Sequence, residues 1–389
     1  MKKPQLQLEE RGLIFDAAKA EPNQRIAFFT SLCVLASGNV IAGFQNGPVK
    51  NSAQSTIRLC RSADSGRTWN LLSSDFVTPW GGIPGSLSCA ELVEVSPGRL
   101  LLFATWFDRR DPALPLFDAE SSGVLPSRQL FAVSSDEGET WDAWRELSTG
   151  NLRGCSITGP VIQWQDGSFA VAFESFKESG DPSVAHHSAW IVVSTDGGQS
   201  FSEPQLVARH PEDQVYYWDQ RLCAAPEPGK FVAMFWSHDL VAHKDLSVHF
   251  CRAKWTPDGM EGAPPAALPI VGQIGAPLIC SDGRLLAFVV DRSQPGTMSL
   301  WHSPDDGETW PREQRLIVHT HEERAVLTQG ADQIDFNQYW EDMGRWSFGH
   351  PALRLLPDGQ LLLAWYAGTP DCMSLHWARI SSLDNIEHE

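Results

Sequence analysis

Four segments of the chain repeat one pattern, in which Ser, Asp, Gly, a hydroxyl residue and an aromatic residue keep a fixed spacing. The pattern reads SADSGRTW at 62–69, SSDEGETW at 134–141, STDGGQSF at 194–201 and SPDDGETW at 303–310. It predicts a β-turn, because Ser and Asp side chains hydrogen-bond nearby backbone amides and Gly tolerates a positive φ. We expect the final aromatic ring to fill the gap beneath each turn. A turn that recurs in this way indicates a fold built from repeated units.

Six hairpin patterns run in step with these turns. Each consists of an apolar run, a Gly turn and a second apolar run, as in VIQWQDGSFAVAFESF, and the turn glycines are Gly38, Gly98, Gly167, Gly229, Gly283 and Gly359. Adding a third strand and, in most units, the repeated turn gives a four-stranded antiparallel blade. The sequence therefore predicts an all-β fold, a six-bladed β-propeller, in one domain that covers residues 1–389.

The last unit has room for only three strands, near 350–356, 360–366 and 373–380, before the chain ends. A propeller blade needs a fourth strand, and the apolar run GLIF at 12–15 lies before the first blade. We expect this N-terminal strand to pair in the last blade and close the ring, which would remove exposed sheet edges.

Charge and composition narrow the class of partner. The net charge of -18 disfavours a nucleic-acid surface, because phosphates would meet a repulsive field. No apolar run approaches the ~20 residues of a membrane-spanning helix, and the polar start of the chain does not resemble a signal peptide, so we expect a cytoplasmic protein that binds no membrane. The eight cysteines lack paired spacing, and we expect buried thiols, no metal and no cofactor.

The repeated turns and the six-unit spacing resemble the sialidase (neuraminidase) superfamily, in which this turn is called the Asp-box or BNR repeat. The resemblance spans essentially the whole chain. It implies one carbohydrate-directed site at one end of the propeller axis. The turn itself marks a fold and not a chemistry, so the function depends on the residues at that site.

One face of the predicted propeller receives the starts of the first strands and the ends of the second strands. Its candidate residues combine carboxylates, guanidinium groups and aromatic rings, a mixture that suits a sugar, whose faces stack on Trp and Tyr while its hydroxyls meet acids and Arg. The candidate catalytic residues are Asp219, Glu174, Asp239, Tyr217 and His350. The candidate substrate-binding residues are Arg25, Arg221, Gln45, Trp106, Asp108, Trp236, His238, Arg292 and Tyr366.

Two short segments that contain some of these candidates lead to specific expectations. QRIAFF resembles the sialidase F/Y-R-I-P segment, which implies that Arg25 holds a substrate carboxylate, although Ala27 replaces Pro and a surface Arg before a strand is the alternative. In YYWDQR, alternation places Tyr217, Asp219 and Arg221 on one strand face. They are candidate site residues, with Arg221 as a second carboxylate-binding Arg, or else an internal ion pair.

Three positions depart from the sialidase pattern. The first-blade loop NGPVKNSAQSTIR has no acid, the fifth-blade strand QIGAPLIC has no Arg, and SFGHPALRLL places His350 where a nucleophilic Tyr is expected. We therefore expect ordinary α-sialosides to be poor substrates. Long loops at 108–129 and 319–348 are expected to wall a pocket, which favours attack on a chain end.

Three hypotheses remain open. The leading one is an exo-acting glycoside hydrolase on an acidic or otherwise decorated sugar, with Asp219 and either Glu174 or Asp239 as the carboxylate pair. The second is a uronate-directed lyase, with Arg221 neutralising the carboxylate and Tyr217, His238 or His350 removing the proton. The third is a catalytically silent propeller that binds glycan or protein. The sequence does not predict the oligomeric state.

Overall fold

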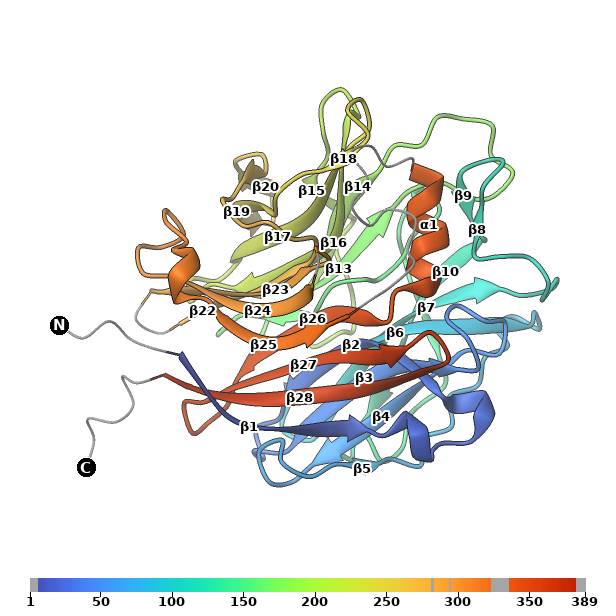
Figure 1. The fold of residues 1–389 in the computed structure, drawn as a ribbon. Helices are drawn as coiled ribbons and strands as arrows, with labels where there is room; N and C mark the ends of the chain where they lie inside the picture. The colour runs from blue at the N-terminus through green and yellow to red at the C-terminus, as the bar shows by residue number, and fades with distance from the viewer. Residues whose placement is uncertain (1–5, 281–282, 294, 323–335, 383–389) are drawn as a thin grey trace.

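The computed structural model describes residues 6–280, 283–293, 295–322 and 336–382, and its regular structure is almost entirely strand. Antiparallel sheets follow one another along the chain, most of them with four principal strands, an arrangement consistent with a β-propeller (Figure 1). Apolar residues alternate along these strands and pack into clusters between neighbouring sheets.

The sheets have the following strands. The N-terminal group is β2 (Ile26–Val34), β3 (Val40–Gly47), β4 (Thr56–Ser62) and β5 (Asn70–Leu71), followed by β6 (Gly85–Ser96), β7 (Arg99–Asp108), β10 (Ser127–Ser134) and β11 (Arg145–Leu147). The next sheet is β12 (Ile162–Gln163), β13 (Phe169–Ser175), β14 (Ser188–Ser194) and β15 (Gln205–Ala208). A larger sheet follows, with β16 (Val215–Ala224), β17 (Lys230–Asp239), β19 (His249–Thr256) and β20 (Gly259–Gly262), and with the short strands β18 (Lys244–Asp245) and β21 (Ala266–Ala267) beside it.

The C-terminal part continues the same order. It contains β22 (Gly275–Ile279), β23 (Leu285–Asp291), β24 (Gly296–Ser303) and β25 (Leu316–His321), then β26 (Phe348–Leu355), β27 (Leu361–Thr369) and β28 (Cys372–Ser382). Outside the main sheets lie the β8 (Phe117–Asp118) and β9 (Gly123–Val124) ribbon, the helix α1 (Phe336–Arg345) and three short 3-10 turns, η1 (Ala17–Lys19), η2 (Pro22–Gln24) and η3 (Arg312–Gln314). Among the described residues, no helix is long and apolar enough to cross a membrane.

The N-terminal strand β1 (Leu6–Phe15) pairs antiparallel with β28, from Leu6 opposite Ser382 to Phe15 opposite Leu375. The expected pairing of the N-terminal run with the C-terminal strands is confirmed, and it extends well before residue 12. A parallel bridge from Ile26 to Met373 also joins β2 to β28, so the first and last strand groups form one continuous sheet.

The four repeated turns share the predicted hydrogen bonds. The Ser hydroxyl accepts a bond from the Gly amide four residues later, at 2.8 Å from Gly66 and Gly138, 2.9 Å from Gly198 and 2.8 Å from Gly307. These glycines have φ between 83° and 91°, the left-handed region that other residues adopt at a cost. In three turns the Trp indole then donates to the carbonyl of this Gly, which seats the ring beneath the turn.

Four first strands share a bulge that the sequence pattern did not predict. The register shifts after Phe28 in β2, Ser88 in β6, Trp218 in β16 and Gly349 in β26. In each bulge a residue other than Gly has a positive φ, namely Phe29 (54°), Cys89 (60°), Asp219 (47°) and His350 (54°). A bulge inserts one extra residue and redirects the side chains that follow it. Residues in or next to all four bulges line the candidate site.

Candidate functional site

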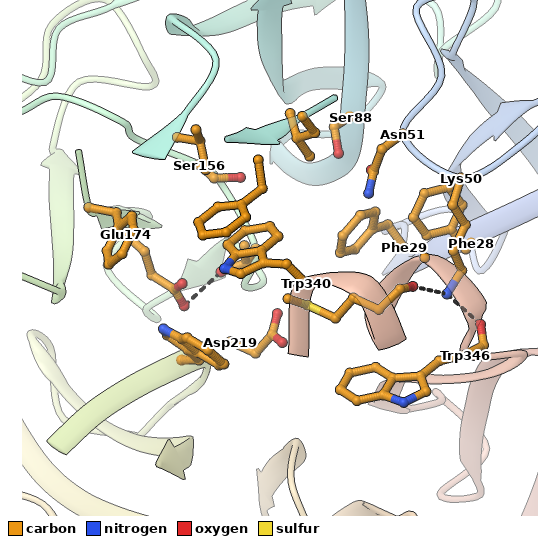
Figure 2. Close-up of a pocket in the computed structure, with 18 of the residues that line it drawn as sticks. Phe28, Phe29, Lys50, Asn51, Ser88, Ser156, Glu174, Asp219, Trp340 and Trp346 are labelled. Atoms are coloured by element: carbon orange, nitrogen blue, oxygen red, sulfur yellow. Dashed lines mark hydrogen bonds between the residues drawn. The ribbon is translucent and has the colours of Figure 1, made fainter. Parts of the chain in front are cut away.

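A cavity of about 650 Å³ opens at the end of the molecule where the first strands begin. Its volume lies within the range typical of small-molecule sites. The lining comes from segments far apart in the chain, including β2, β13, β16, β26, β27, the ribbon β8–β9 and the helix α1 (Figure 2). The long loops expected to wall a pocket do so at residues 115–119 and 338–346, and 323–335 lie outside the described residues.

Two carboxylates, Glu174 and Asp219, lie together in this cavity (Figure 2). Glu174 Oε1 accepts hydrogen bonds from Thr158 Oγ1 and from the backbone amide of Gln220, both at 2.9 Å. Its other oxygen, Oε2, lies 3.4 Å from Nε2 of His187, a buried residue of the lining. Glu174 is therefore held from three sides, and one of its partners is the residue directly after Asp219.

Asp219 is the bulge residue of β16 and its side chain is largely buried, with 16% exposed. Burial raises the pKa of this carboxyl from 3.8 to about 7, and the neighbouring Glu174 charge adds to the rise, while Arg221 and Arg292 oppose it. Nη2 of Arg221 is 3.9 Å from Oδ1 of Asp219. A carboxyl with this pKa retains a proton near neutral pH.

Aromatic side chains form much of the remaining wall. The Trp218 and Trp236 rings meet edge to face with centroids 4.5 Å apart, and the Trp346 ring lies 5.6 Å from that of Trp236. Across the mouth, Trp340 of α1 stacks on Phe117 of β8, with centroids 4.3 Å apart and planes inclined by 5°. Helix and ribbon together roof the cavity.

Lys50 fastens this roof to the sheet beneath. Its ammonium group donates to the backbone oxygen of Trp346 (Figure 2). It also donates to the backbone oxygen of Met343 and to the Tyr366 hydroxyl, both at 3.1 Å. It also lies over the rings of Phe28 and Tyr366. These carbonyls lie at the C-terminal end of α1, where unpaired carbonyls and the helix dipole favour a cation.

Arg292, the other cation of the described lining, is also engaged by the protein. Its Nε donates to Gln273 Oε1 at 2.9 Å and its Nη2 donates to the backbone oxygen of Phe348 at 2.6 Å. The guanidinium group lies 4.1 Å from the ring centroid of Trp346. Both cations therefore hold the walls of the cavity together.

Six of the residues predicted from the sequence line the cavity, and they are Glu174, Asp219, Trp236, Arg292, His350 and Tyr366. His350 is buried, and its Nδ1 lies 3.1 Å from the backbone oxygen of Thr30. Burial, followed by the charge of Arg221, holds its pKa well below the usual range. His350 is thus a neutral imidazole.

Three further candidates lie behind the lining. Gln45 accepts a hydrogen bond from the Ser88 hydroxyl at 2.8 Å, and His238 lies 3.4 Å from Asp245. Arg221 projects into a second cavity of about 10 Å³ that lies beneath the site. That small cavity is lined by residues from or beside the first strands, and they are Thr30, Ser31, Leu32, Glu91, Pro160, Arg221, Leu222, Ala276, Pro277, Pro351, Ala352, Leu353 and Arg354.

The structure does not bring the other five candidates to the cavity. Arg25 is exposed and donates to the Ala20 oxygen, and Asp108 pairs with Arg110 at 2.6 Å. The Asp239 carboxylate accepts bonds from the amides of residues 241 and 242, as in a turn. Trp106 is buried and donates to the backbone oxygen of residue 78.

Tyr217 is the fifth, and its position corrects one expectation. It packs in the core against Phe235 and His249, whereas Trp218 and Asp219 line the cavity. The expectation that Tyr217, Asp219 and Arg221 share one strand face is wrong, because the bulge after Trp218 interrupts the alternation.

The sequence analysis missed several lining residues, namely Lys50, Ser88, His187, Trp218, Trp340 and Trp346. Lys50 lies in the first-blade loop, which the sequence analysis judged only for the absence of an acid. The two tryptophans of the roof lie in a long loop without strand pattern, and His187 belongs to no motif. Among the described residues, no cluster of three or more His, Cys, Asp or Glu side chains could hold a metal ion.

Comparison with known proteins identifies the fold. No family model matches the sequence, and no curated protein matches it. Among solved structures, a protein of unknown function from Dyadobacter fermentans superposes with a TM-score of 0.71 at 16% identity, covering 98% of this chain and 100% of that one. The Hadza microbial sialidase Hz136 gives a TM-score of 0.65 at 15% identity, with 97% and 69% covered.

The intramolecular trans-sialidase from Ruminococcus gnavus, solved with oseltamivir carboxylate, gives a TM-score of 0.62 at 13% identity, with 97% of this chain and 98% of that chain covered. At these identities the likeness concerns the fold alone. The chain has a sialidase-like fold.

Proposed function

We propose that this chain is a single six-bladed β-propeller domain and an exo-acting glycoside hydrolase. The pairing of β1 with β28 and the continuity of β28 with β2 support a closed ring. The small cavity beneath the site supports the blade count, because it is lined by residues from or directly before β2, β6, β12, β16, β22 and β26.

The observation that carries the enzymatic proposal is the Glu174 and Asp219 pair. Glycoside hydrolysis generally uses one carboxylic acid to protonate the leaving oxygen and one carboxylate to attack the sugar or to activate water. The roles of acid and base in such a pair follow from environments that give the two carboxyl groups different pKa values. Asp219, with its pKa near 7, is the proton donor. Glu174, which accepts hydrogen bonds from Thr158 and Gln220, is the nucleophile or base.

The shape of the site supports attack on a chain end. Trp340 and Phe117 stack across the mouth, so the cavity is a roofed pocket rather than an open groove. The aromatic wall offers apolar surface for the C–H faces of a sugar ring. We infer that the terminal sugar enters the pocket while the rest of the glycan remains outside.

Incubation with a panel of aryl glycosides and oligosaccharides, followed by chromatography of the products, tests this function. We expect a free reducing sugar and a loss of about 10²–10⁴-fold in turnover in Asp219→Asn and in Glu174→Gln. An unsaturated product would instead support elimination, with the neutral His350 as candidate base. Binding without any product would support the silent propeller and overturn the proposal.

A further inference from the structure

We propose that the sugar held in this pocket carries no charge. This inference rests on the proposed function and adds a substrate class to it. A carboxylate-bearing sugar needs Arg or Lys donors that point into the pocket and lack protein partners. The positions of the basic residues in the described part of the chain argue against such a grip.

The three arginines nominated from the sequence do not converge in the pocket. Arg25 is exposed and lies outside the lining. Arg221 is 2% exposed and lines the smaller cavity, where its Nη2 lies 3.9 Å from Asp219 Oδ1. Arg292 reaches the lining, but Gln273 and the Phe348 carbonyl accept its hydrogen bonds and Trp346 covers its face.

Lys50, which the sequence analysis did not nominate, offers no free donor either. An ammonium group has three N–H bonds. Lys50 directs hydrogen bonds to the oxygens of Met343 and Trp346 and to the Tyr366 hydroxyl. Recruiting it for a substrate carboxylate would release the end of α1 and loosen the roof.

Apart from the two engaged cations and the histidines, the ionisable side chains of the described lining are the acids Glu174, Asp219 and Glu341. Glu341 pairs with Arg345 at 2.5 Å and burial raises the pKa of Asp219 to about 7, so Glu174 is the acid whose charge a bound carboxylate would meet. A bound carboxylate would lie near Glu174 without a compensating cation, and the net charge of -18 for the whole chain adds long-range repulsion.

Neutral hydroxyl groups, by contrast, find suitable partners. Figure 2 shows Asn51, Ser88 and Ser156 along the side of the pocket opposite Asp219. The Asn51 amide and the Ser156 hydroxyl can both donate to and accept from sugar hydroxyls, and Ser88, whose hydroxyl donates to Gln45, can accept. Together with the tryptophan wall, they fit a ring that has one apolar face and one hydroxylated edge.

Matched pairs of aryl glycosides that differ only at C6 provide the test. Examples are a glucoside with its glucuronide and a galactoside with its galacturonide, each in both anomers. An aryl sialoside is tested alongside them. We expect kcat/KM for the preferred neutral sugar to exceed that for its uronic partner by at least about tenfold, which corresponds to one unit of log K or 1.4 kcal/mol. A glucuronide, galacturonide or sialoside that is cleaved faster than every neutral sugar would overturn the inference while leaving the hydrolase proposal intact.

If no glycoside is cleaved, the hydrolase proposal fails, and tryptophan fluorescence titration with the same pairs still decides the charge preference. Tighter binding of the uronic member, or no binding of either, would count against a neutral sugar. Ser156→Lys serves as the reverse test in this binding assay, because it adds a cation to the wall opposite Glu174, where it offsets the acidic charge. This variant should shift the preference towards the acidic member of each pair, while Ser156→Met, similar in length but uncharged, should not.

Discussion

Asp219 has a backbone conformation that few residues other than Gly adopt, with φ at 47°. Such a conformation costs of order 1–3 kcal/mol and persists where the surrounding structure imposes it. Here it allows two consecutive residues, Trp218 and Asp219, to line the same cavity, which a regular strand would forbid. The strain is thus linked to the placement of the proposed proton donor.

Replacing Asp219 by Asn should alter how stability depends on pH. Because its folded pKa is raised from 3.8 to about 7, the folded protein binds this proton more tightly than the unfolded chain does. The stability that Asp219 contributes is therefore complete below its unfolded pKa and is lost as pH rises through 7. We expect Asp219→Asn to flatten the fall in unfolding free energy between these limits, measured by chemical denaturation at a series of pH values.

Part of that slope should remain in Asp219→Asn, because burial also raises the pKa of Glu91, from 4.5 to about 7. The double variant Asp219→Asn, Glu91→Gln should flatten the curve further. An Asp219→Asn curve with the same slope as the wild type would contradict the raised pKa.

Glu91 should also influence the activity, although it lies outside the main pocket. It shares the small cavity with Arg221, whose charge acts on both Glu91 and Asp219. In Glu91→Gln the positive field of Arg221 would act on Asp219 without an opposing charge, which lowers the pKa of Asp219. We expect the alkaline limb of the pH–activity profile to move to lower pH.

Glu94→Gln is the control for this shift. Glu94 lies on the same strand, β6, but accepts bonds from the amides of Ala36 and Gly98 at the surface. Its profile should match that of the wild type. If Glu91→Gln also leaves the alkaline limb in place, Arg221 does not couple the two acids.

At the scale of elements, one side chain from a distant loop, Lys50, holds the C-terminal end of α1. Lys50→Met keeps an unbranched side chain but removes the ammonium group, which donates to the carbonyls of Met343 and Trp346 and lies over the rings of Phe28 and Tyr366. Each lost bond to a charged group removes about 1.5–3 kcal/mol from the attachment of the helix. We expect faster hydrogen exchange in α1 and a higher KM, with little change in the strands.

Lys19→Met is the matched control, because Lys19 forms only an exposed pair with Asp16. Such pairs contribute little to stability. Equal exchange in α1 of wild type and Lys50→Met would show that the roof is held by Trp340 and Phe117 alone.

The strands and turns were predictable from the sequence, whereas the bulges and the roof were not. Ser, Asp and Gly at fixed spacing predict the repeated turns, because the hydrogen bonds that form each turn lie within one short segment. The hairpins are predicted by apolar runs on either side of a Gly turn. The bulges carry no such signal, because none of the four positions is Gly and Phe29 and Cys89 are of types that seldom adopt a positive φ. Asp and His adopt it more often, but Asp219 and His350 follow no turn pattern in the sequence. The resemblance drew attention to Arg25, but contacts between distant loops decide which cations reach the pocket.

For the whole molecule, the junction of β1 with β28 should contribute strongly to the stability of the proposed ring. Gly12 lies against the indole of Trp377, where an added Cβ would approach Nε1 to 2.9 Å. Gly12→Val should therefore displace Trp377 or separate the two strands, at a cost of about 1–3 kcal/mol. We expect a lower Tm in one cooperative transition, measured by calorimetry.

Leu13→Thr is the control, because the Leu13 side chain is 40% exposed and its replacement keeps the strand pairing. Deleting residues 1–15 should lower the Tm further, since β28 would keep β27 on one side but lose β1 on the other. An unchanged Tm after the deletion would show that β1 does not support the ring.

The same junction places the first and last described residues side by side, with Leu6 opposite Ser382 (Figure 1). Because these residues are neighbours, the chain could begin at another turn and the strands could keep the same order in space. A short flexible linker could join the two, and new termini could be cut in the exposed turn at Asp166 and Gly167. In such a circular permutant β28 and β1 would form an ordinary hairpin, joined by the linker. Their pairing would then no longer depend on contact between the segments that are synthesised first and last.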